Sequence, residues 1–328
     1  MYQAQITAKA GERIDLPAHG ELDASCHVID EDSILAINAA LATGRPLLVR
    51  GEPGVGKSQL ARAAAEALNR VFVSYAVDSR TETRDLLWTV DSVARLAEAQ
   101  LMGAQRDAKP EQLRARLTIG EFVHPGPLWW AFDWGSAKAQ ADRLAITSPF
   151  TRDTWKPQHG VVVLIDEIDK ADPAIPNGLL DAFGHGRFDV PGCKPVRMNS
   201  TQRPLVVITT NEERALPDAF LRRCLVLPLT LPSARDELIE TLVARGQAHF
   251  QADSSERCSD AVLRRAAELL ADDRERLRNQ DLCPPGLAEY LDLIRAVCEP
   301  QRKEKAQLTL MDRVAKFVLR KHPSELGR

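Results

Sequence analysis

The chain has 328 residues and a formal net charge of −3; 44% of its residues are hydrophobic and 27% are charged. These values fit an ordinary globular protein of about two domains. The balanced charge argues against nucleic acid as a partner, since nucleic-acid-binding domains carry a clear basic excess or patch. No run of 18 apolar residues is present and residues 1–16 lack the layout of a signal peptide, so we expect a cytoplasmic protein without a membrane partner.

The first half of the chain alternates helical and strand-like patterns. Residues 30–43 have apolar groups at helical spacing, and residues 46–50 form a short apolar run typical of a buried strand. A glycine-rich loop follows at 51–58, then an alanine-rich helix at 59–69 and a second strand at 71–77. This order predicts an α/β fold with a parallel sheet.

The loop at residues 51–58, called the phosphate loop below, fits the pattern GxxxxGK[ST] between a strand and a helix. Glycines let backbone amides turn inward around an anion, and the helix amino end adds partial positive charge. We expect Lys57 to reach the β- and γ-phosphates and Ser58 to bind Mg²⁺. The predicted nucleotide-binding residues are Gly51, Glu52, Pro53, Gly54, Val55, Gly56, Lys57, Ser58 and Gln59.

All five tryptophans lie in the long segment between the second and third strands. They are Trp88, Trp129, Trp130, Trp134 and Trp155. The group after Gly126 has a spacing that would bury one helical face, which is the usual place of such large apolar side chains. A role in gripping a client protein is the alternative for some of them.

Three further apolar runs, at 160–165, 205–208 and 225–227, complete five predicted strands, and continuous apolar runs suit strands covered on both faces. Asp166 and Glu167 end the third strand, where parallel sheets bind ligands. We expect Asp166 to hold Mg²⁺ directly or through water, and Glu167 to activate a water for attack on the γ-phosphate. Asn211, at the end of the next strand, would position the same water.

Two arginines follow the fourth strand, at Arg222 and Arg223. A guanidinium suits the charge of a transferring phosphoryl group and can be supplied by a neighbouring subunit. A pair of surface arginines on a helix is the simpler interpretation.

The chain changes character after residue 232. Residues 233–250, 259–270, 286–297 and 308–319 all have amphipathic helical patterns. We therefore predict a nucleotide-binding α/β domain over 1–232, with an insertion at about 88–158, and an all-helical lid domain over 233–328. The six cysteines form no CxxC pair, and we expect them to be reduced thiols without a metal; they are Cys26, Cys193, Cys224, Cys258, Cys283 and Cys298.

In this order, the phosphate loop, Asp166-Glu167, Asn211 and Arg223 resemble the MoxR branch of the AAA+ ATPases. Further matching segments are residues 122–128, 166–171, 179–183 and the hairpin-like stretch 186–192. The resemblance covers residues 28 to 230 well and the helical remainder loosely.

This resemblance implies a P-loop AAA+ domain with a five-stranded parallel sheet and a helical lid, assembling into a hexameric ring. ATP and Mg²⁺ would be bound between subunits, with Arg223, or failing that Arg222, completing the neighbour's site. Members of this branch act as chaperone-like remodellers of protein clients, often beside proteins with von Willebrand factor A domains. The chain departs from the wider family at residues 282–289, where no basic residue stands for the usual lid arginine; Arg278 and Arg295 flank this stretch.

Three functions are consistent with these features. The first is an ATP-hydrolysing chaperone, favoured by Lys57, Asp166, Glu167, Asn211 and Arg223 together. The second is a nucleotide-gated regulatory module with little turnover, favoured by the absent lid arginine. The third is a nucleic-acid-translocating NTPase subunit, against which the charge balance argues. The sequence does not distinguish ATP from GTP.

Overall fold

The computed structural model describes residues 5–20, 22–104, 116–149, 155–172, 174–251, 258–278 and 282–319. The chain forms two compact units. The first unit is made of Met1–Ala8, Asp32–Val49 and Ala64–Leu227, and the second of Lys9–Glu31, Arg50–Ala63 and Pro228–Arg328. The second unit thus combines the C-terminal helices with the phosphate loop. A domain boundary at residue 232 stays a prediction.

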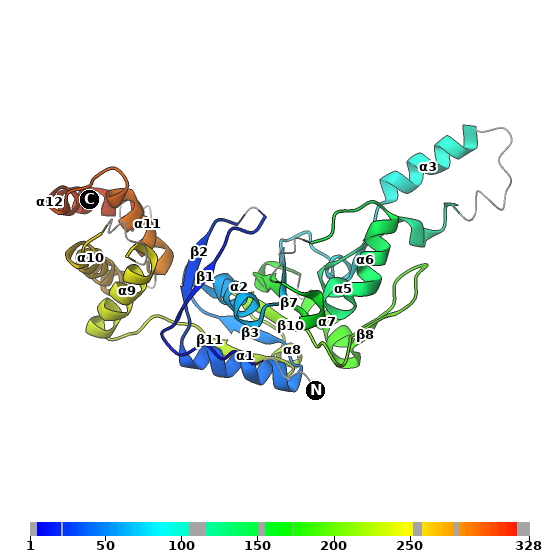
Figure 1. The fold of residues 1–328 in the computed structure, drawn as a ribbon, viewed down its shortest axis with the longest axis horizontal. Coiled ribbons are helices and arrows are strands. Elements are labelled where there is room, and N and C mark those ends of the chain that lie inside the picture. The colour runs from blue at the N-terminus through cyan, green and yellow to red at the C-terminus, as the bar shows by residue number, and fades with distance from the viewer. Residues whose placement is uncertain are drawn as a thin grey trace. The chain divides into compact units, whose positions relative to one another are not determined.

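A five-stranded parallel sheet lies at the centre of the first unit (Figure 1). Its strands, in spatial order, are β11 (Leu225–Pro228), β3 (Leu47–Arg50), β10 (Leu205–Thr210), β7 (Val161–Asp166) and β4 (Val71–Ala76). All five predicted strands are confirmed. Val163 of β7 is paired with Val206 of β10 and with Val73 of β4, and all three are buried. Because β7 and β10 are parallel neighbours, their carboxyl ends meet at one edge of the sheet.

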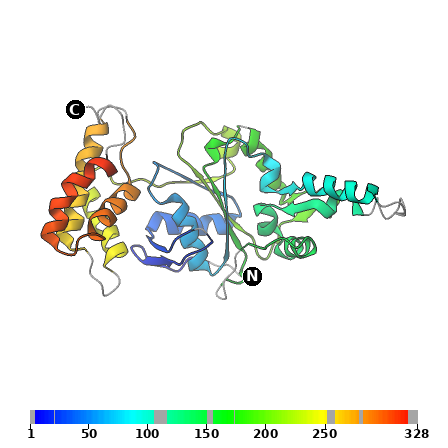
Figure 2. The same cartoon turned by 90° about the horizontal axis from the view of Figure 1, so that it is seen from above.

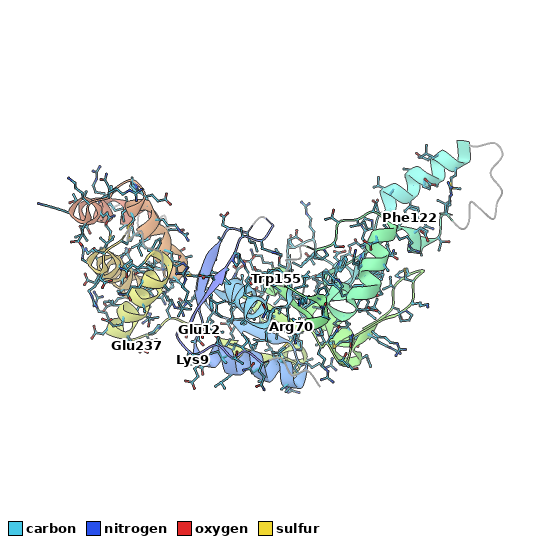
Figure 3. The ribbon with its side chains drawn as sticks, viewed as in Figure 1. Lys9, Glu12, Arg70, Phe122, Trp155 and Glu237 are labelled. Carbon is cyan, nitrogen blue, oxygen red and sulfur yellow. A yellow bond between two sulfur atoms is a disulfide. The ribbon has the colours of Figure 1, made fainter. Side chains whose placement is uncertain are left out.

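The helices of the α/β part of the chain connect the strands of the sheet. They are α1 (Glu31–Thr43), α2 (Lys57–Leu68), α3 (Ser92–Ala104), α5 (Pro127–Phe132), α6 (Trp134–Arg143), α7 (Ala174–His185) and α8 (Asp218–Leu221). Short 3-10 helices lie at η1 (Thr83–Leu86), η2 (Ile119–Phe122), η3 (Pro157–His159) and η4 (Ile168–Lys170). Helix α5 packs on β4 and β7. Helix α3 projects away from the sheet in both ribbon views (Figures 1 and 2), and Phe122 lies near its base (Figure 3).

Two small antiparallel pairs accompany the central sheet. Strand β5 (Trp88–Val90) pairs with β6 (Val123–Pro125), and β8 (Arg187–Phe188) pairs with β9 (Val196–Arg197). The predicted hairpin-like stretch at 186–192 holds the first strand and part of the turn of this second pair, and the return strand lies beyond it at Val196–Arg197. The first pair brings together the two ends of residues 88–125, which lie within the predicted insertion. Residues 105–115 and 150–154 of this insertion lie outside the described residues.

The aromatic group after Gly126 is buried in the first unit. Trp129 and Trp130 are 3% and 5% exposed, and the Trp129 indole donates a hydrogen bond of 2.8 Å to the Ser136 hydroxyl. The ring of Trp134 lies 4.8 Å from that of Trp130. The expected burial of this aromatic group is confirmed, because the large apolar rings of Trp129 and Trp130 are both shielded from water.

Two buried side chains hold the segment after α2 in place (Figure 3). Trp155 donates from its indole to the Glu66 carboxylate at 3.2 Å, and Arg70 donates to the Arg203 carbonyl at 2.9 Å. These contacts join segments about ninety and more than a hundred residues apart in the chain. These two contacts fix the backbone that leads into β4, which is the strand at one edge of the sheet.

The second unit contains a bundle of four helices and a short antiparallel hairpin. The helices are α9 (Arg235–Phe250), α10 (Asp260–Arg278), α11 (Leu287–Cys298) and α12 (Glu304–Val318); the hairpin strands are β1 (Arg13–Leu16) and β2 (Ser25–Val28). Helix α9 packs on both α10 and β2. Every predicted helix is confirmed, and α10 extends to Arg278, past its predicted end at Leu270. Within the described residues, no helix is long and apolar enough to cross a bilayer.

The expectation that all six cysteines are reduced is wrong for two of them. Cys258, before α10, and Cys298, at the end of α11, form a disulfide. Their Cα atoms are 6.2 Å apart, and both side chains are buried among the lid helices. The pairing could not be foreseen, because forty residues separate the two cysteines and only helix packing brings them together. Cys26, Cys193, Cys224 and Cys283 are free thiols, as expected.

Candidate nucleotide site

The phosphate loop depends on glycine at its first position. A Cβ atom on Gly51 would lie 2.1 Å from the Leu229 carbonyl oxygen, so any larger residue would collide with backbone. Gly56, before the helix, has φ of +100°, a conformation that residues with a side chain rarely adopt. These two residues let the loop turn sharply between β3 and α2.

Lys57 and the amino end of α2 give the loop its anion-binding character. The Lys57 side chain is 7% exposed, and its ammonium donates to the carbonyls of Gly51 at 2.8 Å and of Glu52 at 2.9 Å. Helix α2 begins at Lys57 and has no acidic side chain in its first turn. A cation beside a helix amino end attracts phosphate, and the residues present therefore fit a nucleoside triphosphate.

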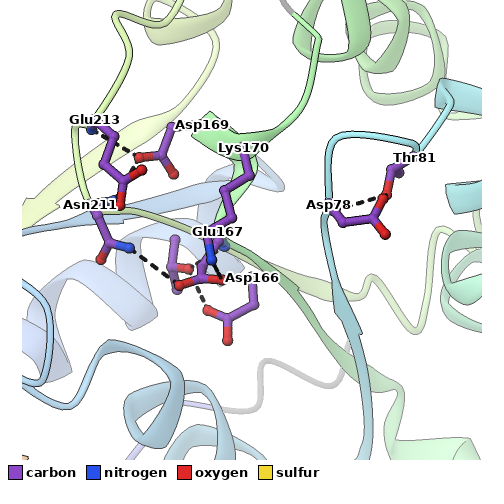
Figure 4. A network of polar contacts seen from close by, with 9 residues as sticks. Asp78, Thr81, Asp166, Glu167, Asp169, Lys170, Asn211 and Glu213 are labelled. Carbon is purple, nitrogen blue, oxygen red and sulfur yellow. Dashed lines mark hydrogen bonds and ion pairs between the residues drawn. The ribbon is translucent and has the colours of Figure 1, made fainter.

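A polar network connects the ends of β7 and β10 (Figure 4). The Thr209 hydroxyl donates to the Asp166 carboxylate at 2.5 Å and accepts a bond of 2.9 Å from the Glu167 backbone amide. The Asn211 side-chain amide donates to the Glu167 carboxylate at 3.3 Å. Glu167 and Asn211, which are predicted to act on one water, are therefore brought together, and Asp166, the predicted Mg²⁺ ligand, belongs to the same network.

Glu167 has a left-handed backbone conformation, with φ of 60° and ψ of 49°. A residue with a side chain adopts this conformation at an energetic cost, of order 1 kcal/mol or more, and such residues gather at functional sites. Lys170, three residues later, forms an ion pair with the Glu167 carboxylate at 2.5 Å. The hydrogen bond to Glu167 raises the pKa of Lys170.

Asp169 holds the turn that follows β10. Its side chain is 2% exposed and accepts hydrogen bonds from the backbone amides of Asn211 at 3.1 Å and Glu213 at 3.0 Å. A buried carboxylate is stabilised by such bonds to backbone donors. Asp169 thus fixes the backbone from which Asn211 reaches Glu167.

The family of the chain follows from comparison with protein families. The family model of the AAA domain (dynein-related subfamily) matches residues 46–224, which is more than half of the chain. This chain belongs to the AAA domain family. The matched residues of the AAA domain include the phosphate loop, the acidic end of β7 and Asn211.

Comparison with solved structures gives a weaker likeness. A crystal structure of a candidate ATPase from Cytophaga hutchinsonii has 14% sequence identity to this AAA protein and a TM-score of 0.36. The alignment covers 88% of this chain and 79% of the other. None of the curated proteins compared with the chain matches it.

The predicted site residues of the AAA domain lie in two groups. Asp166, Glu167 and Asn211 are together at one edge of the sheet, in the first unit. The phosphate loop and the first turn of α2 lie in the second unit. The catalytic, nucleotide-binding and magnesium-binding roles of these residues stay predictions.

The segment carrying the two candidate arginines is held by a residue that sequence reasoning missed. The Arg45 guanidinium donates to three successive carbonyls, those of Arg222, Arg223 at 3.1 Å and Cys224 at 3.0 Å. Both Arg222 and Arg223 are exposed, so their side chains are accessible at the surface of the unit. No motif marks Arg45, which is 177 residues or more from its acceptors.

A buried histidine lies beside the phosphate loop in the second unit. His27 of β2 is 3% exposed, and its ring is 3.8 Å from where a Cβ on Gly56 would be. The pKa of His27 is lowered to about 4, chiefly by burial and also by the nearby Arg245 and His249, while Asp30 opposes them. The imidazole is therefore neutral at physiological pH.

Acidification is expected to destabilise the protein through His27. The unfolded chain binds a proton near pH 6.5 and the folded chain only near pH 4, so stability is fully present above pH 6.5 and is lost as pH falls toward 4. The loss is about 2 kcal/mol at pH 5. Urea unfolding at pH 7.5 and pH 5 measures it, with His27→Gln as the non-titrating comparison. An equal loss in both proteins would contradict the assignment.

Proposed function

We propose that this AAA protein hydrolyses ATP in the presence of Mg²⁺ and uses the reaction to remodel protein clients. The observation that supports this most is the arrangement of Glu167, whose carboxylate is held by Asn211 while its backbone amide is held by Thr209. A carboxylate positioned in this way can accept a proton from water. Mg²⁺ would supply charge neutralisation for the transferred phosphoryl group.

Each remaining residue of the proposed reaction has one role. Lys57 binds the phosphates of the nucleotide together with the backbone amides of the phosphate loop. Ser58 and Asp166 hold the metal. Arg223 stabilises phosphoryl charge in the neighbouring subunit of a ring, which we propose to be hexameric and of the MoxR type. The proposed location is the cytoplasm, and the proposed client is a protein with a von Willebrand factor A domain.

The Lys170–Glu167 ion pair favours a second candidate, a nucleotide-gated module with little turnover. The pair holds the Glu167 carboxylate 2.5 Å from an ammonium, so the carboxylate would have to leave Lys170 before it could act on a water. Such a protein would bind ATP, keep it and signal through its bound state. The rate of steady-state phosphate release distinguishes the two functions.

The direct test is phosphate release from ATP and Mg²⁺ by the wild-type protein and by Lys57→Ala. We expect wild-type turnover, and at least about a tenfold loss of ATP affinity in the variant, since it lacks a charge-assisted contact to phosphate. Lys138→Ala removes an exposed lysine that forms an ion pair with Asp142 of the same helix, α6, and serves as the matched control. Tight ATP binding without wild-type turnover would favour the second candidate.

A further inference from the structure

The second residue of the phosphate loop is paired with an arginine of the lid. The Arg274 guanidinium, on α10, donates to the Glu52 carboxylate at 2.8 Å and to the Pro285 carbonyl at 2.7 Å. The Arg274 side chain is 3% exposed and that of Glu52 is 37% exposed. Arg274 therefore lies inside the second unit, while its partner stands at the surface of the loop.

Helix α11 makes a second connection between the lid and the loop. The backbone amide of Ala288 donates to the Gly54 carbonyl at 3.0 Å. A Cβ on Gly286 would lie 2.8 Å from the Pro53 carbonyl, so glycine is needed for this close approach. Two lid helices thus hold the loop, α10 through a side-chain bond to Glu52 and α11 through a backbone bond to Gly54.

The arginines that the sequence suggested for the lid are engaged elsewhere. Arg278 donates to the Ser233 carbonyl at 3.4 Å, and Arg295 pairs with Asp292 on its own helix. Arg274 is one turn before Arg278 on α10. Arg274 is a lid arginine whose side chain bonds to the phosphate loop.

The pair also balances the charge of the loop. The negative charge of the Glu52 carboxylate would repel an anionic ligand on the same loop, and the Arg274 guanidinium neutralises that charge. A buried guanidinium in turn requires its partner, because removing one member of a buried pair leaves an uncompensated charge. The Glu52 residue is held twice, by Arg274 at its side chain and by Lys57 at its carbonyl.

We infer that Arg274 is a positioning residue that acts through Glu52 to couple the lid to nucleotide binding at the phosphate loop. When phosphate draws the Lys57 ammonium from the Glu52 carbonyl, the Arg274 bond continues to hold the Glu52 side chain. Movement of the loop is thereby transmitted to α10. The inference rests on the proposed nucleotide-binding function and adds the lid contact that the sequence lacks at residues 282–289.

A double-mutant cycle with Glu52→Gln and Arg274→Met tests this coupling. Each single variant should weaken binding of a non-hydrolysable ATP analogue and raise KM for ATP about tenfold, with kcat changing much less. The double variant should be little worse than either single variant, because both remove the same interaction. Arg274→Lys should restore part of the affinity. Calorimetric binding and steady-state kinetics measure these effects.

The matched control is an exposed lid pair of the same type, Arg264 of α10 with Glu240 of α9. Arg264→Met should leave analogue affinity and the nucleotide-induced rise in Tm unchanged. If Arg274→Met does not fold, Glu52→Gln and Arg274→Lys decide the question on their own.

Additive losses in the cycle, or lowered stability with unchanged analogue affinity, would overturn the coupling. A wild-type protein that binds the analogue but releases no phosphate would contradict the proposed hydrolysis alone, since the cycle can still be read from binding. Failure of the two proposals is therefore distinguishable.

Discussion

Glu167→Gln is expected to bind ATP normally and to lower kcat by at least about a hundredfold. The amide of glutamine keeps the size of the side chain and can still bond with Asn211, but it cannot accept a proton from water. Glutamine also carries the same Cβ as glutamate, so the left-handed backbone is no more strained than before. Phosphate release and analogue binding, measured on the same preparation, separate turnover from affinity.

Glu213→Gln is the control for this variant. Glu213 lies in the same region (Figure 4), where its backbone amide bonds to Asp169, but its carboxylate has no proposed role in the reaction. Turnover should stay within about twofold of wild type, as is usual for surface substitutions. Unchanged phosphate release by Glu167→Gln would remove Glu167 from the reaction.

Arg223→Ala is expected to lower kcat by about a thousandfold, the size of effect found for arginines that stabilise a transferring phosphoryl group. Because the arginine is proposed to act on the neighbouring subunit, the loss should be repaired by mixing. Arg223→Ala retains Glu167, and Glu167→Gln retains Arg223. A mixed assembly therefore contains interfaces with both groups intact, and its turnover should exceed that of either variant alone.

Arg222→Ala separates the two neighbouring arginines. Its side chain is exposed and its carbonyl, which Arg45 holds, is unaffected by the substitution. A small loss in this variant beside a large one in Arg223→Ala identifies Arg223 as the acting residue; the reverse result identifies Arg222. Mixed assemblies that recover no turnover would contradict action between subunits.

The parts of the fold that the sequence predicted are those encoded by local pattern. The five strands are mostly apolar runs, and two of them lead directly to site residues: β7 ends at Asp166, and Asn211 follows β10. The phosphate loop is recognisable because eight consecutive residues carry its whole geometry. Helix ends were less certain, since α10 continues to Arg278 through charged residues that lack a strong apolar repeat.

The parts that the sequence did not reveal depend on contacts between distant segments. Arg274 and Glu52 are separated by 222 residues in the sequence. Arg45 bonds to backbone carbonyls, which every residue has, so no residue type marks its partners. Thr209 could have been found, because a hydroxyl within a buried apolar strand requires a hydrogen-bond partner. The Cys258–Cys298 pair follows from helix packing that no spacing rule describes.

The left-handed backbone at Glu167 limits which replacements can be used in a mutant library at this position. Asparagine, aspartate and glycine tolerate this conformation, whereas valine, isoleucine and threonine do not, because a branched Cβ clashes there. Loss of turnover in the first group reports the chemistry of the side chain. Loss of turnover in the valine, isoleucine and threonine variants would combine the loss of the carboxylate with a displaced end of β7. A selection at position 167 would therefore first remove residues that cannot adopt the left-handed backbone, and only then residues that cannot support turnover.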